Sequence, residues 1–146
     1  MNRTTRSLAA VACTALMATT FAACGSSGSE ALTKSEWIKK ADKICKDTTT
    51  ELNKIGDKLS SAKTAEDANK ILGEGADKTL DEVKAIKKLT PPKSISKDVD
   101  AMLAAVTEGA NKIKTDGVAL LQSGQNPLAD ASTKAKALGL KECGSN

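Results

Sequence analysis

Histidine, tyrosine and arginine are scarce or missing in this chain, and their scarcity excludes several kinds of chemistry. The sequence has no histidine and no tyrosine, and its only arginines are Arg3 and Arg6. Histidine is the commonest general base and the commonest metal ligand in proteins. No calcium-binding loop of the D-x-D-x-D-G kind occurs either. We therefore predict no catalytic residue, no metal site and no cofactor.

Aromatic residues are equally rare, which bears on nucleic-acid binding. Trp37 is the only aromatic residue after Phe21. Proteins that read nucleic acids use arginine to grip phosphate and guanine, and aromatic rings to stack on bases. After residue 23 the charged residues are 20 lysines and 18 acids, which are interleaved and leave a formal charge of +2. This pattern indicates a solvated surface of mixed sign and predicts no nucleic-acid partner.

The first residues have the features of a secretory signal peptide. Arg3 and Arg6 precede residues 8–23, which are apolar apart from three threonines. A basic start, a short apolar stretch and small residues before a cleavage point are typical of such peptides. Sixteen residues are too few to cross the hydrocarbon core comfortably. We predict that residues 1–23 are a signal peptide, and a retained membrane anchor is the alternative.

The residues Phe21-Ala22-Ala23-Cys24 resemble the lipobox of bacterial lipoproteins. The resemblance implies that Cys24 carries a diacylglyceryl group and becomes the new N-terminus, with residues 24–32 as a flexible tether. Two acyl chains make a stable anchor where one is marginal. Phe21 departs from the pattern, which prefers leucine there. Ordinary signal-peptide cleavage that releases a soluble protein is therefore the alternative.

The predicted cleavage before Cys24 decides which cysteines remain available for a disulfide. Cys13 leaves with the signal peptide and Cys24 carries lipid, so Cys45 and Cys143 remain. A single pair in an exported domain predicts a disulfide. A catalytic thiol is the alternative. Such a thiol needs a nearby base, usually histidine, and this chain has no histidine.

Residues 33–146 read as an all-α domain. A capping box at Thr33 and Glu36 and a hydrophobic staple of Leu32 and Trp37 start the first helix. The other predicted helices run from Thr64 to Leu89 with a possible break at Gly73–Gly75, from about Ser96 to Ser123, and from Asn126 and Pro127 to a stop at Gly139. Short connections favour antiparallel neighbours, so we predict an up-down-up-down four-helix bundle with one disulfide.

Three features offer a functional interpretation beside a structural one. Trp37 is either a ring that stacks on a ligand or part of the hydrophobic staple at the helix start. Gly73 and Gly75 either line a ligand cleft or allow another helix to pack closely. The acidic pairs Asp81–Glu82 and Asp98/Asp100 resemble the carboxylates of glycosidases, but lysines at helical spacing balance most acids in the chain. We favour the structural interpretation of each.

Four motifs together resemble small exported lipoproteins of high-GC Gram-positive bacteria: the lipobox, "ADKIC" (41–45), "LTPP" (89–92) and "LGLKECG" (138–144). The resemblance implies a helical domain anchored by lipid on the extracytoplasmic face of the cell membrane, and it carries no catalytic residue across. We expect a monomeric, non-enzymatic module that binds an envelope protein or another envelope component. The alternative is a carrier or sensor of a small apolar ligand held between the helices, which requires an internal cavity.

Overall fold

The computed structural model describes residues 31–145, which contain no strand and are 76% helical. The predicted signal peptide and Cys24 lie outside the described residues. The predicted all-α class is confirmed, but five helices stand where the sequence predicted four. They are α1 (Lys34–Ser60), α2 (Ala65–Lys87), α3 (Ser96–Asp116), α4 (Val118–Ser123) and α5 (Ala129–Leu138).

The first two helices begin where their capping residues predict. The Thr33 hydroxyl accepts the backbone N–H of Glu36 at 3.3 Å, and the Glu36 carboxylate accepts the backbone N–H of Thr33 at 3.0 Å. Thr64 accepts the N–H of Asp67 at 3.0 Å in the same way. These bonds satisfy N–H groups that have no partner inside a helix. The capping box at Thr33 is therefore confirmed.

The long third helix that the sequence predicted is divided at Gly117. This residue has φ 48° and ψ −122°, a conformation that separates α3 from α4 and that glycine adopts readily. The amide oxygen of Asn69, on α2, accepts the N–H of Val118 at 2.8 Å and occupies the space beside the Gly117 Cα. The division thus depends on a contact between residues 49 positions apart.

Two other helix boundaries differ from the prediction. No break occurs at Gly73 or Gly75, because α2 runs through both glycines without interruption. The last helix starts at Ala129 rather than Pro127. The Asn126 side chain accepts the N–H of Leu128 at 2.9 Å, so this asparagine forms a local turn before the helix instead of capping it.

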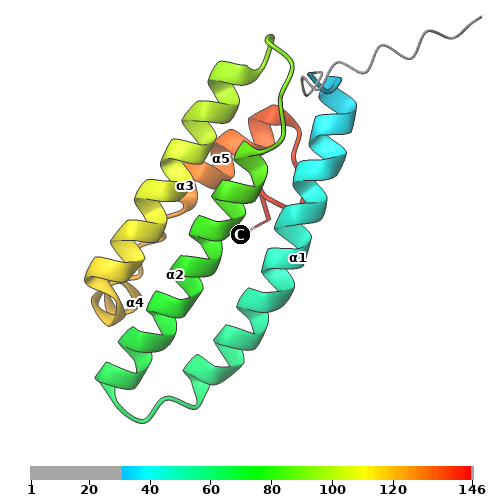
Figure 1. Ribbon diagram of the computed structural model, residues 1–146. Coiled ribbons are helices and arrows are strands. Elements are labelled where there is room, and N and C mark those ends of the chain that lie inside the picture. Colours follow the sequence, from blue (N-terminus) through cyan, green and yellow to red (C-terminus); the bar gives the residue numbers. More distant parts are fainter. Residues whose placement is uncertain (1–30, 146) are drawn as a thin grey trace, which may run out of the picture.

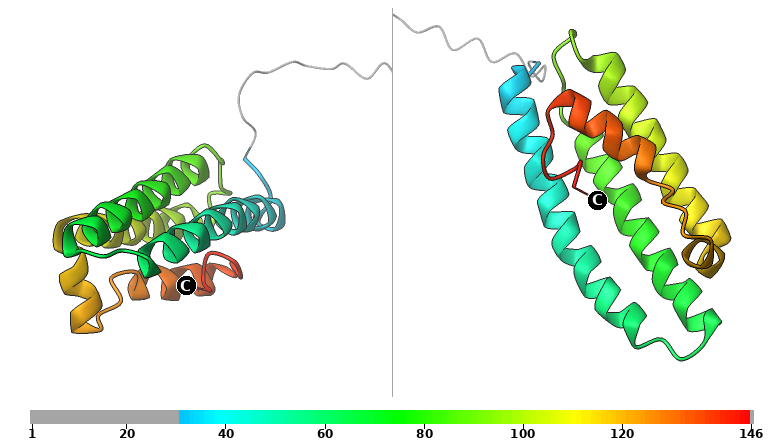
Figure 2. Two further views of the ribbon diagram at one scale, coloured as in Figure 1. Left: turned by 90° about the horizontal axis from the view of Figure 1, so that it is seen from below. Right: turned by 180° about the vertical axis from the view of Figure 1, so that it is seen from behind.

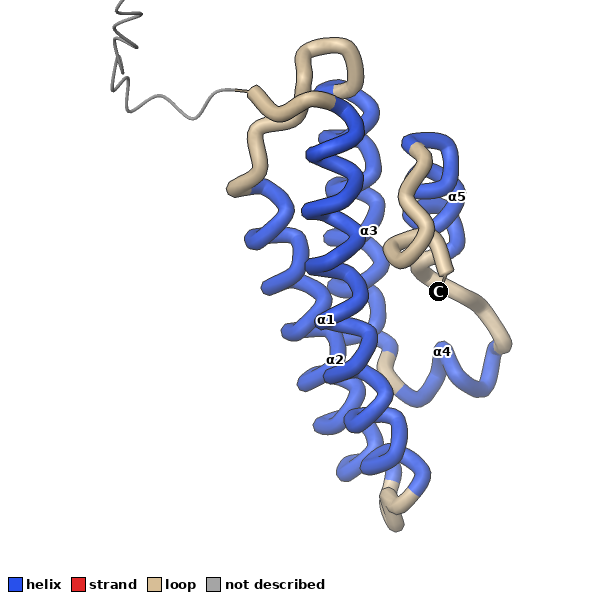
Figure 3. The backbone as a smooth tube through the Cα atoms, turned by 90° about the vertical axis from the view of Figure 1, so that its right-hand side faces the viewer, coloured by secondary structure: helices blue, strands red, loops and turns tan. Residues whose placement is uncertain are grey.

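The three long helices alternate in direction, and α2 packs against both α1 and α3 (Figure 1). The last helix, α5, packs against α3 and lies across the same side of the bundle as the C-terminal residues (Figure 2). The short helix α4 turns away from α3 at one end of the bundle and leads into the connection to α5 (Figure 3). The core lies between these helices.

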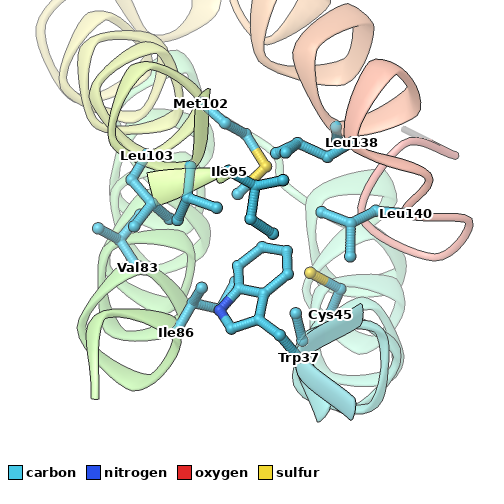
Figure 4. Packing of buried hydrophobic residues seen from close by; sticks show 12 residues of the cluster. Trp37, Cys45, Val83, Ile86, Ile95, Met102, Leu103, Leu138 and Leu140 are labelled. Carbon is cyan, nitrogen blue, oxygen red and sulfur yellow. The ribbon is translucent and has the colours of Figure 1, made fainter. Parts of the chain in front are cut away.

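Trp37 lies in the middle of that core. Its side chain is fully buried and its ring is surrounded by Ile86, Ile95 and Cys45 (Figure 4). Leu32 is half-buried and packs against the same cluster, which fits the predicted staple. The cluster joins all three long helices to the C-terminal residues: Trp37, Ala41, Cys45, Val83, Ile86, Ile95, Val99, Met102, Leu103, Ala135, Leu138 and Leu140.

The C-terminal segment turns back from α5 and joins α1. Gly139 has φ 94° and ends α5, and the N–H of Leu140 then bonds to the carbonyl of Ala135 at 3.0 Å. This is the glycine stop with a trailing apolar residue that the sequence predicted, and Leu140 is buried. Cys143 then forms the predicted disulfide with Cys45, with 5.1 Å between the Cα atoms.

Two glycine substitutions should change stability in opposite directions. Gly117→Ala should destabilise the protein by about 2 kcal/mol or more, because a side chain is strained at this φ and its Cβ meets Asn69. Gly73→Ala should stabilise it by up to ~1 kcal/mol, since a Cβ there meets nothing within 4 Å and alanine favours helix. Urea denaturation measures both, and a shift in the same direction for the two variants would contradict the structure.

Candidate functional site

The residues singled out from the sequence do not come together as a reactive group. Cys24, the predicted lipidation site, lies outside the described residues. Cys45 and Cys143 are joined as a disulfide. Trp37 is buried in the core, and its indole N–H has no acceptor among the described residues. Its ring therefore serves packing and presents no face to a ligand.

Three of the four paired acids lie on exposed faces, as a solvated surface requires. Asp98 and Asp100 are exposed on the first turns of α3. Asp81 is exposed on α2 and forms an ion pair with Lys84 at 2.8 Å. The hydrogen bond from Lys84, together with its charge, holds the pKa of Asp81 below the ordinary value. Such exposed pairs contribute little to stability.

Glu82, the fourth acid, has a different environment. It is half-buried on the side of α2 that faces α1. Burial raises the pKa of Glu82 above the ordinary value, and a hydrogen bond from the Thr48 hydroxyl partly opposes that rise. None of the ion pairs among the described residues includes Glu82. From the sequence, Glu82 is grouped with the solvated acids, and that prediction is wrong for this residue.

A signal for the position of Glu82 does exist in the sequence. Residue 82 follows Thr79 by three positions and precedes Ile86 by four, and both of these are buried. Residues at this spacing share a helix face, so Glu82 belongs to the edge of the buried stripe of α2. To predict that Glu82 is partly buried, one must know how wide the buried stripe of α2 is, and that width depends on the neighbouring helices.

Glu82 lines a small cleft in the middle of the bundle, beside the disulfide. The cleft has a volume of about 30 Å³ and receives residues from α1, α2, α3 and the C-terminal part of the chain. Its lining consists of Leu52, Thr79, Glu82, Val106, Leu128, Ala131, Ser132 and Cys143. Because Cys143 is in a disulfide, Glu82 is the only ionisable group in this lining.

The cleft offers limited chemistry. The Thr79 hydroxyl donates to the carbonyl of Gly75 at 3.1 Å, and the Ser132 hydroxyl donates to the carbonyl of Gly144 at 2.8 Å. Both hydroxyls are thus already used inside the fold, and one carboxyl group alone does not make an acid–base pair. A volume of this size holds about one water molecule. Ligand pockets are typically ten times larger.

Larger hollows of about 370–400 Å³ occur on the outside of the domain. One lies between α3 and α5 and another between α2 and α3, and both are lined in part by exposed charged side chains such as Asp98 and Lys84. Within residues 31–145, no group of three or more Cys, Asp or Glu residues is placed to hold a metal ion. None of the helices in the same residues is long and apolar enough to cross a membrane.

Comparison with known proteins adds no assignment. The chain matches no protein-family model, and no curated protein or solved structure gives a significant match. The resemblance to exported lipoproteins therefore stays a prediction that depends on the motifs quoted above.

Replacing Glu82 should reveal its burial through the pH dependence of stability. Because its pKa is raised in the folded protein, the stability it contributes falls as pH rises from the unfolded pKa through the folded one. Glu82→Gln removes that loss, so the variant should be more stable than the wild type at pH 7, by about 1.4 kcal/mol for each unit by which folding raises the pKa. Below about pH 4 the carboxyl is protonated in both the folded and the unfolded protein, so the variant and the wild type should be equally stable.

Asp81→Asn is the matched control for this experiment. Its pKa is lowered in the folded protein, so its contribution is present at neutral pH and is lost as pH falls through the folded pKa. The Asp81→Asn variant should therefore be slightly less stable than the wild type at pH 7. Urea denaturation at both pH values measures the two effects, and the same sign for both variants would contradict the different environments of these neighbours.

Proposed function

We propose that this chain is a lipid-anchored protein of the extracytoplasmic membrane face, whose helical domain binds another envelope protein through its outer surface. The observation that carries this proposal is the filled interior. The cleft between the helices has only about 30 Å³, and its lining has one ionisable group. A domain with so little internal space and no paired reactive groups there acts through its surface.

The alternative function, a carrier or sensor of a small apolar ligand between the helices, has no observation in its favour. Such a ligand needs enclosed space of several hundred Å³. The inner cleft is about ten times smaller, and the larger hollows lie on the outside. Binding at the surface accounts for the structure with fewer assumptions.

The binding surface is polar for the most part. Among the described residues, Leu121 on α4 is the only large hydrophobic side chain that is strongly exposed, at 56%. Non-obligate interfaces are often no more apolar than the rest of a protein surface. A partner that associates reversibly with a monomeric domain therefore fits this composition.

The proposal includes the arrangement predicted from the sequence at both ends of the chain. Residues 1–23 are the signal peptide, Cys24 carries the lipid, and the tether predicted at residues 24–32 ends at Leu32, which packs against the core. In the domain, α1, α2, α3 and α5 constitute an up-down-up-down bundle, with α4 as part of the connection between α3 and α5. The contacts of α2 with α1 and α3, and of α5 with α3, support that arrangement.

Metabolic labelling with a fatty acid tests the anchor. The wild-type protein should incorporate the label, whereas Cys24→Ala should not, because the proposed thioether is then missing. Cys13→Ala is the matched control and should be labelled like the wild type, since Cys13 lies in the segment that is removed. Equal labelling of the Cys24→Ala variant and the wild type would refute lipidation at Cys24.

Crosslinking in intact cells, followed by mass spectrometry, tests the binding function. Every helix of residues 31–145 except α4 carries lysines, so an amine-reactive crosslinker reaches most of the surface of the domain. We expect crosslinks from one face of the domain to one envelope protein, and we expect them to weaken when residues of that face are substituted. Native mass spectrometry of the gently extracted protein is the counter-test, because a retained small apolar molecule would overturn the surface proposal.

A further inference from the structure

The two ends of the helical domain differ in charge. One end, formed by residues 32–40 and 87–97, contains one acid, Glu36, and seven lysines. All seven lysines are exposed, and none takes part in the ion pairs of the described residues. We call this set the basic end: Lys34, Lys39, Lys40, Lys87, Lys88, Lys93 and Lys97. The next acids on α3 are Asp98 and Asp100, and counting them still leaves an excess of four positive charges.

The opposite end has no such excess. Residues 54–74 and 108–116 contain six lysines and six acids. Two of the lysines are paired, Lys58 with Glu74 at 3.6 Å and Lys114 with Asp77 at 2.7 Å. The positive charge of the domain is therefore concentrated at one end of its long axis.

The chain enters the domain at the basic end. The N–H of Leu32 donates to the carbonyl of Thr90 at 3.0 Å, which fixes the start of the described chain beside the connection between α2 and α3 (Figure 1). The eight residues that follow Cys24 span at most about 30 Å. A lipid at Cys24 thus holds the basic end near the membrane, while the other end of α1 lies ~40 Å further along the helix.

We infer that the basic end docks on the anionic phospholipid headgroups of the membrane to which the chain is anchored. The inference rests on the proposed lipid anchor, which brings this end to the surface. Electrostatic attraction acts over a Debye length of about 8 Å at physiological salt, so only the near end responds to the membrane charge. Each lysine close to an anionic surface strengthens binding about five-fold.

Docking in this way orients the domain. The long helices then point away from the membrane, and the sides of the bundle and its opposite end face outward. Those surfaces are the ones left accessible to a protein partner. The lysines of the basic end meet lipid instead.

Lysine reactivity on vesicles tests the inference. The protein purified from cells is mixed with vesicles of phosphatidylcholine alone, or of phosphatidylcholine and phosphatidylglycerol at three to one. A membrane-impermeant acetylating reagent then modifies exposed lysines, and mass spectrometry gives a rate for each. On the anionic vesicles, Lys34, Lys39, Lys88 and Lys93 should react several-fold more slowly than on neutral ones. The rates of Lys54, Lys63, Lys70 and Lys112 should be the same on both.

The outcomes separate the two proposals. If the protein sediments with both vesicles and the two lysine sets react alike, the anchor stands and the docking inference is overturned. If the protein sediments with anionic vesicles only and its basic-end lysines are protected, docking is supported and the anchor is refuted. If it sediments with neither, both proposals fail.

Two charge-matched variants complete the test. The first carries K34Q, K39Q, K88Q and K93Q, and the second carries K54Q, K63Q, K70Q and K112Q. All eight lysines are exposed and lie outside the ion pairs, so the variants lose the same charge at opposite ends. Only the first should lose the protection of its remaining basic-end lysines, Lys40, Lys87 and Lys97, on anionic vesicles. Equal losses in both variants would mean that net charge, and not the basic end, is responsible.

Discussion

The link between α1 and the last residues of the domain is the constraint on which the rest of the fold depends. The final helix has only ten residues, and helices of that length are marginal by themselves in water. The disulfide from Cys45 to Cys143 closes a loop of 98 residues, which is worth up to ~4.7 kcal/mol in the chain-entropy treatment. Asp42 adds to it, because its carboxylate accepts the N–H groups of Lys141 and Glu142 at 3.0 Å. Together these contacts hold α5 and Leu140 against the core.

The C-terminal segment also lines the small cleft between the helices. Cys143 and residues of α5 line a cleft of only about 30 Å³, and Glu82 is the one ionisable group in its lining. The ion pairs of the described residues lie on the exposed surface of the domain, away from this cleft. Glu51 with Lys78 joins α1 to α2, and Asp77 with Lys114 joins α2 to α3. Exposed pairs of this kind add little stability, so the fold does not depend on them.

The sequence predicts those features that depend on a few neighbouring residues. The capping box at Thr33, the glycine stop at Gly139 and the pairing of the two cysteines follow from local chemistry or from counting. The features it did not predict depend on residues far apart in the chain. The division at Gly117 requires Asn69, and the burial of Glu82 requires α1 to cover one side of α2. The unbroken course of α2 through Gly73 has the same origin, because packing against α1 and α3 offsets the low helix propensity of glycine.

The burial of Trp37 gives the domain a single internal optical reporter. The chain has no other tryptophan and no tyrosine, so its tryptophan fluorescence arises from one ring in the middle of the core. That ring lies beside Cys45, where the C-terminal segment is joined to α1 (Figure 4). The emission of the native protein therefore reports whether this segment is closed over the core, without contributions from the rest of the molecule.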